Sequence, residues 1–261
     1  NQISFAAGGS GRIETANVGS IYVDAYGAST WSGFDLRHAE VVGGTFEVGD
    51  LTLGHSGRIH MDDTTTFSRF YVRDDFRMGG DYTPVFGPLP ADVDLQVGVD
   101  AATPGGIALT KGETIAAEAG TGAFIAYLDT LTVGGTLNLS LMATCTVNAA
   151  NAAVHIGDAT AGDSGTVSLP AGTAIFGSMS IGDASRTGTL VLDRTAVVVT
   201  GNVAVGAGAD ITINVGTAAD QGLTVEGAST FDPGAGIFID FQEDPGSTVM
   251  HWGLKVEGDH V

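Results

Sequence analysis

A short motif returns at a nearly fixed interval through the second half of the chain. It consists of an apolar residue, any residue, an apolar residue and a glycine, and it occupies residues 131–134, 154–157, 179–182 and 203–206, with a stretched fifth copy at 223–227. Its second apolar residues are Val133, Ile156, Ile181, Val205 and Val225, so the steps are 23, 25, 24 and 20 residues. Such a period indicates a fold built from equivalent stacked units.

Two further motifs recur in phase with the first. The second has the form Gly-Thr-apolar-x-apolar in most copies and ends at Leu139, Leu169, Leu192 and Ile213. The third is a less regular apolar run, for example at 144–147, 174–177 and 196–201. Short alternating runs bounded by Gly, Asp and Asn are typical of strands and turns. The sequence therefore predicts an all-β fold, a parallel β-solenoid (β-helix) of about 24 residues per coil with three short strands in each coil.

One coil alone has no partner for its backbone groups or its inward apolar row, and stacking coils about 4.8 Å apart satisfies both. Stacking predicts one apolar ladder through Val133, Ile156, Ile181 and Val205, and another through the residues that end the second motif. The glycine that closes the first motif is expected at a corner, where φ is often positive. A β-sandwich is the alternative, although nothing in a sandwich requires the motifs to repeat in phase.

The regularity of the repeat divides the chain. We expect irregular N-terminal coils over residues 1–50 and a solenoid over 51–261, with loop insertions near 80–94 and 111–127. Three prolines between 84 and 90 predict an external loop, folded back on its own coil or in contact with a neighbouring subunit. Residues 95–98 are assigned to the first motif and 106–109 to the second, and 114–119 is the one segment expected to form a helical turn.

Charge and cysteine content exclude several classes of protein. The net charge is −20, from 30 acidic and 10 basic residues, and no basic patch exists for a phosphate backbone or an anionic membrane. An acidic surface favours solubility and divalent cations. Cys145 is the only cysteine, so an internal disulfide is excluded and a buried thiol is expected. No apolar run is long enough to cross a bilayer.

The motifs carry a resemblance to a known family. The Gly-Thr-Leu-x-Leu and Leu-Thr-Val-Gly-Gly segments resemble the autotransporter-associated strand repeats of secreted bacterial β-helix surface proteins. The segments 241–246 and 251–261 resemble the region before the sorting tail of proteins exported by the PEP-CTERM route, although that tail does not occur in this sequence. The resemblance implies a β-helix that is secreted. A first residue other than methionine agrees with a mature chain after signal-peptide removal, located outside the cell or on its surface, and a trimmed chain would look the same.

Few residues are arranged for chemistry. The pairs at 62–63 and 74–75 are the best acid and base candidates, but neighbouring carboxylates on a strand point to opposite sides, so solvated corners and no catalytic or cofactor site are expected. The histidines have no metal-ligand spacing. Asp158 and Asp183 each stand two residues after the second apolar residue of the first motif in their coil. Stacking of the coils would therefore bring them within about 5 Å. They are either turn-forming residues open to water or ligands of a calcium ion.

Two functions remain open. The first is a secreted structural protein that assembles with copies of itself into a fibre, sheath or surface layer. In that case Ile3 and Phe5, in the uncharged strand-like segment 2–7, would pair with an exposed edge of the next subunit and give a head-to-tail polymer. The alternative is a glycan-binding or polysaccharide-degrading β-helix module, in which exposed aromatic residues would stack on sugars. Its candidate residues are Tyr22, Tyr26, Trp31 and Trp252.

Overall fold

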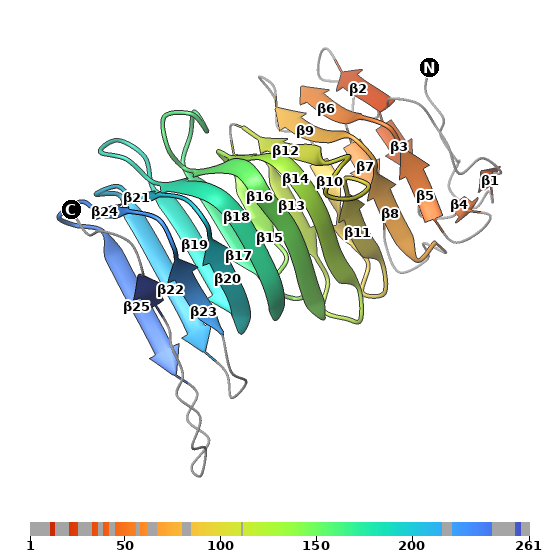
Figure 1. Cartoon of the computed structure of the whole chain (residues 1–261). Coiled ribbons are helices and arrows are strands. Elements are labelled where there is room, and N and C mark those ends of the chain that lie inside the picture. The colour runs from red at the N-terminus through yellow and green to blue at the C-terminus, as the bar shows by residue number, and fades with distance from the viewer. Residues whose placement is uncertain are drawn as a thin grey trace, which may run out of the picture.

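The chain folds into an elongated stack of β-coils with its first strands at one end and its last strands at the other (Figure 1). This computed structural model describes residues 11–13, 21–25, 33–35, 39–41, 45–55, 58–61, 67–79, 85–110, 112–215, 221–241 and 254–256. Every regular element in these ranges is a strand. The predicted parallel β-solenoid, with coils spaced by roughly 24 residues, is confirmed.

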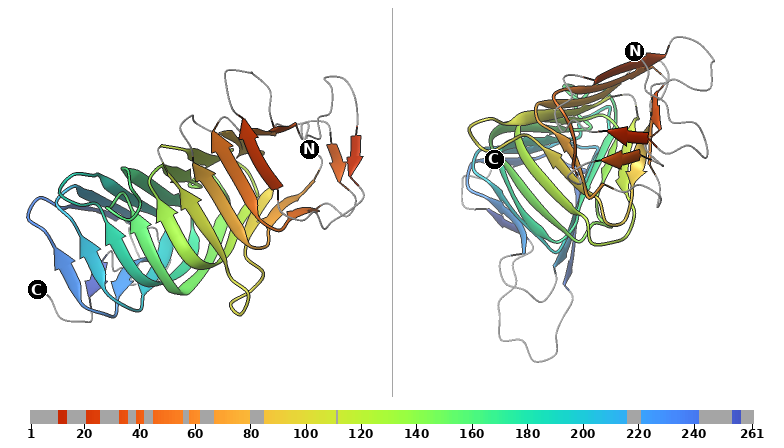
Figure 2. Two further views of the ribbon diagram at one scale, coloured as in Figure 1. Left: turned by 90° about the horizontal axis from the view of Figure 1, so that it is seen from above. Right: turned by 90° about the vertical axis from the view of Figure 1, so that its right-hand side faces the viewer.

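Each coil contributes strands to three faces, as the three motifs predict, and strands of successive coils lie over one another when the stack is turned (Figure 2). The first face contains β2 (Ile21–Ala25), β6 (Leu51–His55), β9 (Asp75–Gly79), β12 (Gly105–Leu109), β21 (Val203–Val205) and β24 (Ser229–Phe231). The third face contains β5 (Thr45–Val48), β8 (Arg69–Val72), β11 (Asp94–Val97), β20 (Thr195–Val199), β23 (Gly222–Val225) and β26 (Leu254–Val256). Three long strands bend across both faces: β14 (Ala123–Val133), β16 (Thr144–Ile156) and β18 (Gly172–Ile181).

The second face is a separate nine-stranded sheet in the described part of the chain. In chain order it contains β3 (Gly33–Asp35), β7 (Arg58–His60), β10 (Val85–Leu89), β13 (Thr114–Ala117), β15 (Thr136–Asn138), β17 (Gly165–Leu169), β19 (Gly188–Asp193), β22 (Ala209–Val215) and β25 (Gly236–Phe241). Among the strands that the structure describes, β1 (Gly11–Ile13) and β4 (Ala39–Val41) pair only with each other. β2, β3 and β5, which precede residue 51, pair with β6, β7 and β8 in the same two large sheets as the later coils.

The predicted apolar ladder exists with the predicted register. Val133 pairs with Ile156, Ile156 with Ile181, and Ile181 with Val205, and all four side chains are buried. The second ladder likewise joins Leu169, Leu192 and Ile213 along the second face. Parallel in-register stacking keeps equivalent side chains in one column, so an apolar motif repeated once per coil produces a continuous dry core.

The positive φ expected at the motif glycine is confirmed in two of the four regular copies of the motif and does not occur at Gly134 or Gly206. Gly157 and Gly182 have φ of 61° and 63°. A Cβ on Gly157 would lie 2.1 Å from the carbonyl oxygen of Thr187 in the next coil. Any side chain at this position would therefore push the two coils apart as well as strain the backbone.

Two assignments of the motifs to faces are wrong. Val225 pairs with Val199 on the third face, and the residue that continues the column beyond Val205 is Phe231. In the same way residues 95–97 lie on the third face, whereas Leu109 continues the first-face column between Met78 and Val133. Both errors arise because any two faces carry the same apolar alternation, so a strand can be assigned to the wrong face of its coil.

The expected insertions near 80–94 and 111–127 also contain strands. β13 replaces the expected helical turn and pairs with β10 and β15. Within the predicted external loop, β10 lies inside the second face, and its register shifts between Phe86 and Leu89. Pro88 falls within that shift, where the regular ladder does not need its missing N–H.

The buried end of this proline-rich segment explains why it forms a strand. An external loop would leave Phe86 exposed, but Phe86 is buried, and its ring centroid lies 5.0 Å from that of Phe70 and 4.8 Å from that of Phe76. Three phenylalanines from the three faces therefore meet in the core. Burial of this aromatic surface outweighs the poor strand propensity of the prolines.

Candidate functional site

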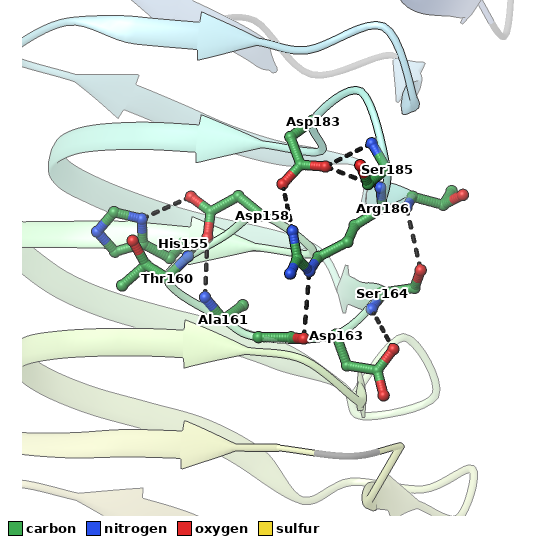
Figure 3. A network of polar contacts seen from close by, with 11 residues as sticks. His155, Asp158, Thr160, Ala161, Asp163, Ser164, Asp183, Ser185 and Arg186 are labelled. Carbon is green, nitrogen blue, oxygen red and sulfur yellow. Dashed lines mark hydrogen bonds and ion pairs between the residues drawn. The ribbon is translucent and has the colours of Figure 1, made fainter.

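The corners between the first and second faces hold Asp158 and Asp183, the two candidate calcium ligands, and both lie in a network of polar contacts (Figure 3). Asp158 is almost fully buried. Its Oδ1 accepts hydrogen bonds from the backbone N–H groups of Thr160 and Ala161, each at 2.9 Å. Its Oδ2 lies 2.6 Å from Nδ1 of His155, which stands outward on the strand before the corner. The hydroxyl of Ser180, from the next coil, also donates to this carboxylate.

Asp183 repeats this arrangement in the following coil with an arginine in place of the histidine. Its Oδ1 accepts from the N–H groups of Ser185 and Arg186 at 2.7 and 2.8 Å. Its Oδ2 lies 2.8 Å from Nη1 of Arg186. The same guanidinium donates from Nε to the carbonyl oxygen of Gly162, in the corner loop of the previous coil, at 3.2 Å. Arg186 thereby connects two successive corner loops.

The electrostatics of the two carboxylates result from these contacts. Burial of Asp158 opposes its ionisation, but the hydrogen bonds from Ala161, His155 and Ser180 outweigh burial and lower the pKa of the carboxyl below its usual value. The hydrogen bond from Ser185 lowers the pKa of Asp183, partial desolvation opposes it, and the bonds and charge of Arg186 lower it further. Both carboxylates are therefore held ionised with donors of their own loop around them.

This geometry accounts for both residues as turn-stabilising groups. The Asx-type bonding satisfies backbone N–H groups that the corner removes from the ladder. No cluster of three or more His, Cys, Asp or Glu suited to a metal ion occurs among the residues that the structure describes. Binding of calcium by Asp158 and Asp183 stays a prediction, and a cation would have to displace donors that these oxygens already have.

The remaining candidates are less informative. Asp75 forms an ion pair with Arg77, and its backbone N–H donates to Asp50 at 3.4 Å, while the pair at 62–63 lies outside the described residues. Cys145 is buried, as expected, and burial raises the pKa of its thiol to about 12.

Of the aromatic residues proposed to stack on sugars, only the backbone of Tyr22 is described, in β2. Tyr26, Trp31 and Trp252 lie outside the described residues. The assembly candidates Ile3 and Phe5 also lie outside them.

The sequence did not predict the exposed apolar side chains of β25, at the C-terminal end of the stack. At the C-terminal end of the second face, Ile237 and Ile239 continue the columns of Ile211 and Ile213, which are each 1% exposed. Ile237 is nevertheless 37% exposed, and Phe238, the next residue of β25, is 62% exposed. The alternation in 236–241 predicts a strand, but only the structure shows that this strand is the last of its sheet among the described residues.

The other two faces end in the same way. Phe231 lies one step beyond Val205 and Leu254 one step beyond Leu223, and both are only partly buried whereas their partners are buried. In the described ranges, the C-terminal end of the core is therefore apolar on all three faces. No protein-family model, curated protein or solved structure matches this chain. In the described part, no helix is long and apolar enough to cross a membrane.

Proposed function

We propose that this protein is an extracellular structural protein, a β-solenoid subunit that assembles with copies of itself into a fibre, sheath or surface layer. The observation that carries the proposal is the exposed apolar end of the core, represented by the 37% exposure of Ile237 directly over the buried Ile211. Apolar side chains and strand edges at an open coil are unfavourable in water, so coverage of this end by a further chain is stabilising.

The polar groups of the corners support the same function. His155, Asp158, Asp183 and Arg186 bond to their own loops and to the neighbouring coil, which fixes the shape of the stack. The net charge of −20 keeps such a subunit soluble before it assembles. Secretion and a surface location rest on the resemblance to β-helix surface proteins and belong to this proposal.

Electron microscopy and sedimentation velocity of the purified protein test the proposal. We expect filaments or sheets that form above a threshold concentration and resist moderate salt, because backbone hydrogen bonds and apolar burial hold them together. Dispersed monomers at every concentration, together with binding on a glycan array, would overturn the proposal in favour of a glycan-binding module.

A truncated chain tests the connector that the sequence predicts. Removal of residues 1–7 takes away Ile3 and Phe5 and is expected to leave a folded monomer, with an unchanged far-UV circular dichroism spectrum and no fibres. Polymerisation of the truncated chain at the native threshold would exclude this segment as the connector.

A further inference from the structure

The two ends of the stack differ in how well they cover the core. At the N-terminal end, β5 pairs only with β8 among the described strands, yet Phe46 and Val48 of β5 are buried. Phe46 packs against Phe70, with ring centroids 5.2 Å apart. At the C-terminal end, β25 pairs only with β22 in the described part, and its core position Ile237 is exposed. The C-terminal end is therefore the acceptor, the end that receives a further strand, since apolar side chains that are already buried gain little from docking.

The chemistry of this acceptor defines what can bind there. In β25, Ile237 and Ile239 continue the core columns, and Phe238 between them lies on the outer surface. A ligand strand must therefore carry apolar residues at alternate positions and leave its backbone free to pair. Asp240, next to Ile239 in β25, is exposed, and Asp232 is exposed in the corner before β25, so an acidic strand would be repelled.

One segment of the chain meets these requirements. Residues 2–7 alternate apolar and small or polar side chains through Ile3 and Phe5, and no charged residue occurs before Arg12. Arg12, the charged residue that follows the segment, is positive, opposite in sign to the exposed aspartates near the acceptor. The alternating pattern of the segment and its lack of acidic residues both fit β25.

We infer that β25 is the docking edge for the N-terminal segment of a second copy of this chain, which adds as a further parallel strand with Ile3 over Ile237, Ser4 beside Phe238 and Phe5 over Ile239. The inference rests on the proposed function and specifies its interface. The contact is heterologous, because the donor and acceptor are different surfaces, so it propagates along the stack axis (Figure 1).

Engineered cysteines test this contact directly. Adjacent strands place outward residues about 4.8 Å apart, within the Cα separation of a disulfide. Mixing Ser4→Cys with Phe238→Cys protein under mild oxidation is expected to give a disulfide-linked dimer that neither variant gives alone. Thr166→Cys replaces Phe238→Cys in the control, because Thr166 has paired strands on both sides and should not react. The native Cys145 is buried and does not interfere.

The outcomes separate this inference from the proposed function. Dimers of Phe238→Cys alone would show a tail-to-tail contact and overturn the inference, as would a mixture that reacts no better than the control while the native protein assembles. Both of these outcomes leave self-assembly intact. Failure of the native protein to assemble at any concentration, with no dimer in the mixture, would overturn the proposed function and the inference together.

A matched pair of charge substitutions gives an independent readout. Ile237→Asp places an unpaired charge under the incoming strand and is expected to raise the assembly threshold about tenfold or more. Ile175→Asp is the control, because Ile175 is similarly exposed, at 39%, but lies between β16 and β20 in the middle of the stack. Its threshold should stay at the native value. Thermal melts of both variants establish that they are folded, and an equal shift of the two thresholds would contradict the docking edge.

Discussion

Replacing Ile181 by alanine tests the ladder that organises the core. Ile181 is fully buried in β18 and stacks between Ile156 and Val205. The substitution removes three carbon atoms, worth about 2.4 kcal/mol at about 0.8 kcal/mol for each buried carbon. The ladder cannot close the resulting cavity without losing backbone hydrogen bonds, so a cavity term adds to this loss. We expect a total decrease of about 3–4 kcal/mol in the free energy of unfolding.

The matched control lies in the same strand. Ile175 is also in β18 but points outward and is 39% exposed. Its replacement by alanine removes the same three carbons from a site that water already reaches, so no closed cavity forms, and the loss is expected at about 1–1.5 kcal/mol. Comparing the two variants cancels any general effect of placing alanine in a strand.

Urea denaturation followed by far-UV circular dichroism measures both changes. The slope of the transition must match that of the native protein, since coils stabilise their neighbours and a local loss can split the transition. A loss for Ile175→Ala that equals or exceeds the loss for Ile181→Ala would refute the register, because a shift by one residue exchanges the inward and outward sets. Ile181→Asp should be more harmful than Ile181→Ala, because it adds an unpaired buried charge.

Three further outcomes are expected at the corners. The lowered pKa of Asp158 means that its ionised form stabilises the fold above the unfolded pKa of about 4 and that this stability is lost as the pH falls through the folded pKa. The stability difference between native and Asp158→Asn protein should therefore shrink as the pH is lowered below about 4 in urea titrations. Gly165→Ala should lower the melting temperature by several degrees, because its Cβ would lie 1.8 Å from the carbonyl oxygen of Val133. Millimolar calcium should leave the melting temperature unchanged if the corners act only as turns, and an increase that Asp158→Asn and Asp183→Asn both abolish would establish a cation site instead.

The fold was predictable because successive coils of a solenoid require the same types of residue at equivalent positions. Ile156 and Ile181 must both be apolar since they occupy one column, and Gly157 and Gly182 must both turn the chain at the same corner. A periodic pattern of this kind determines the register along a face. It does not determine which face a strand joins, and for this reason the repeat places residue 225 in the wrong column.

The corner network and the open end could be predicted only in part. The spacing of Asp158 and Asp183 indicated equivalent corners, but their partners depend on side chains that the repeat leaves free to vary, a histidine in one coil and an arginine in the next. The strand pattern around Ile237 is the same as in inner coils. Exposure at a stack end depends on whether another coil covers the strand, and the local sequence of the strand does not contain that information.

A heterologous interface, unlike an isologous one, has separate donor and acceptor surfaces, so each can be inactivated without the other. A subunit with Ile237→Asp keeps its N-terminal segment, so below its own raised assembly threshold it adds to a native fibre but does not accept the next subunit. A subunit that lacks residues 1–7 accepts a neighbour but cannot add. Each variant should therefore shorten native fibres in proportion to its share of the mixture, acting at opposite ends. Mixed with each other in the absence of native protein, the two variants have one intact donor and one intact acceptor between them, so sedimentation velocity should show dimers and nothing larger. Longer species in that mixture would mean that a second contact holds the fibre together, because neither variant can extend it through β25.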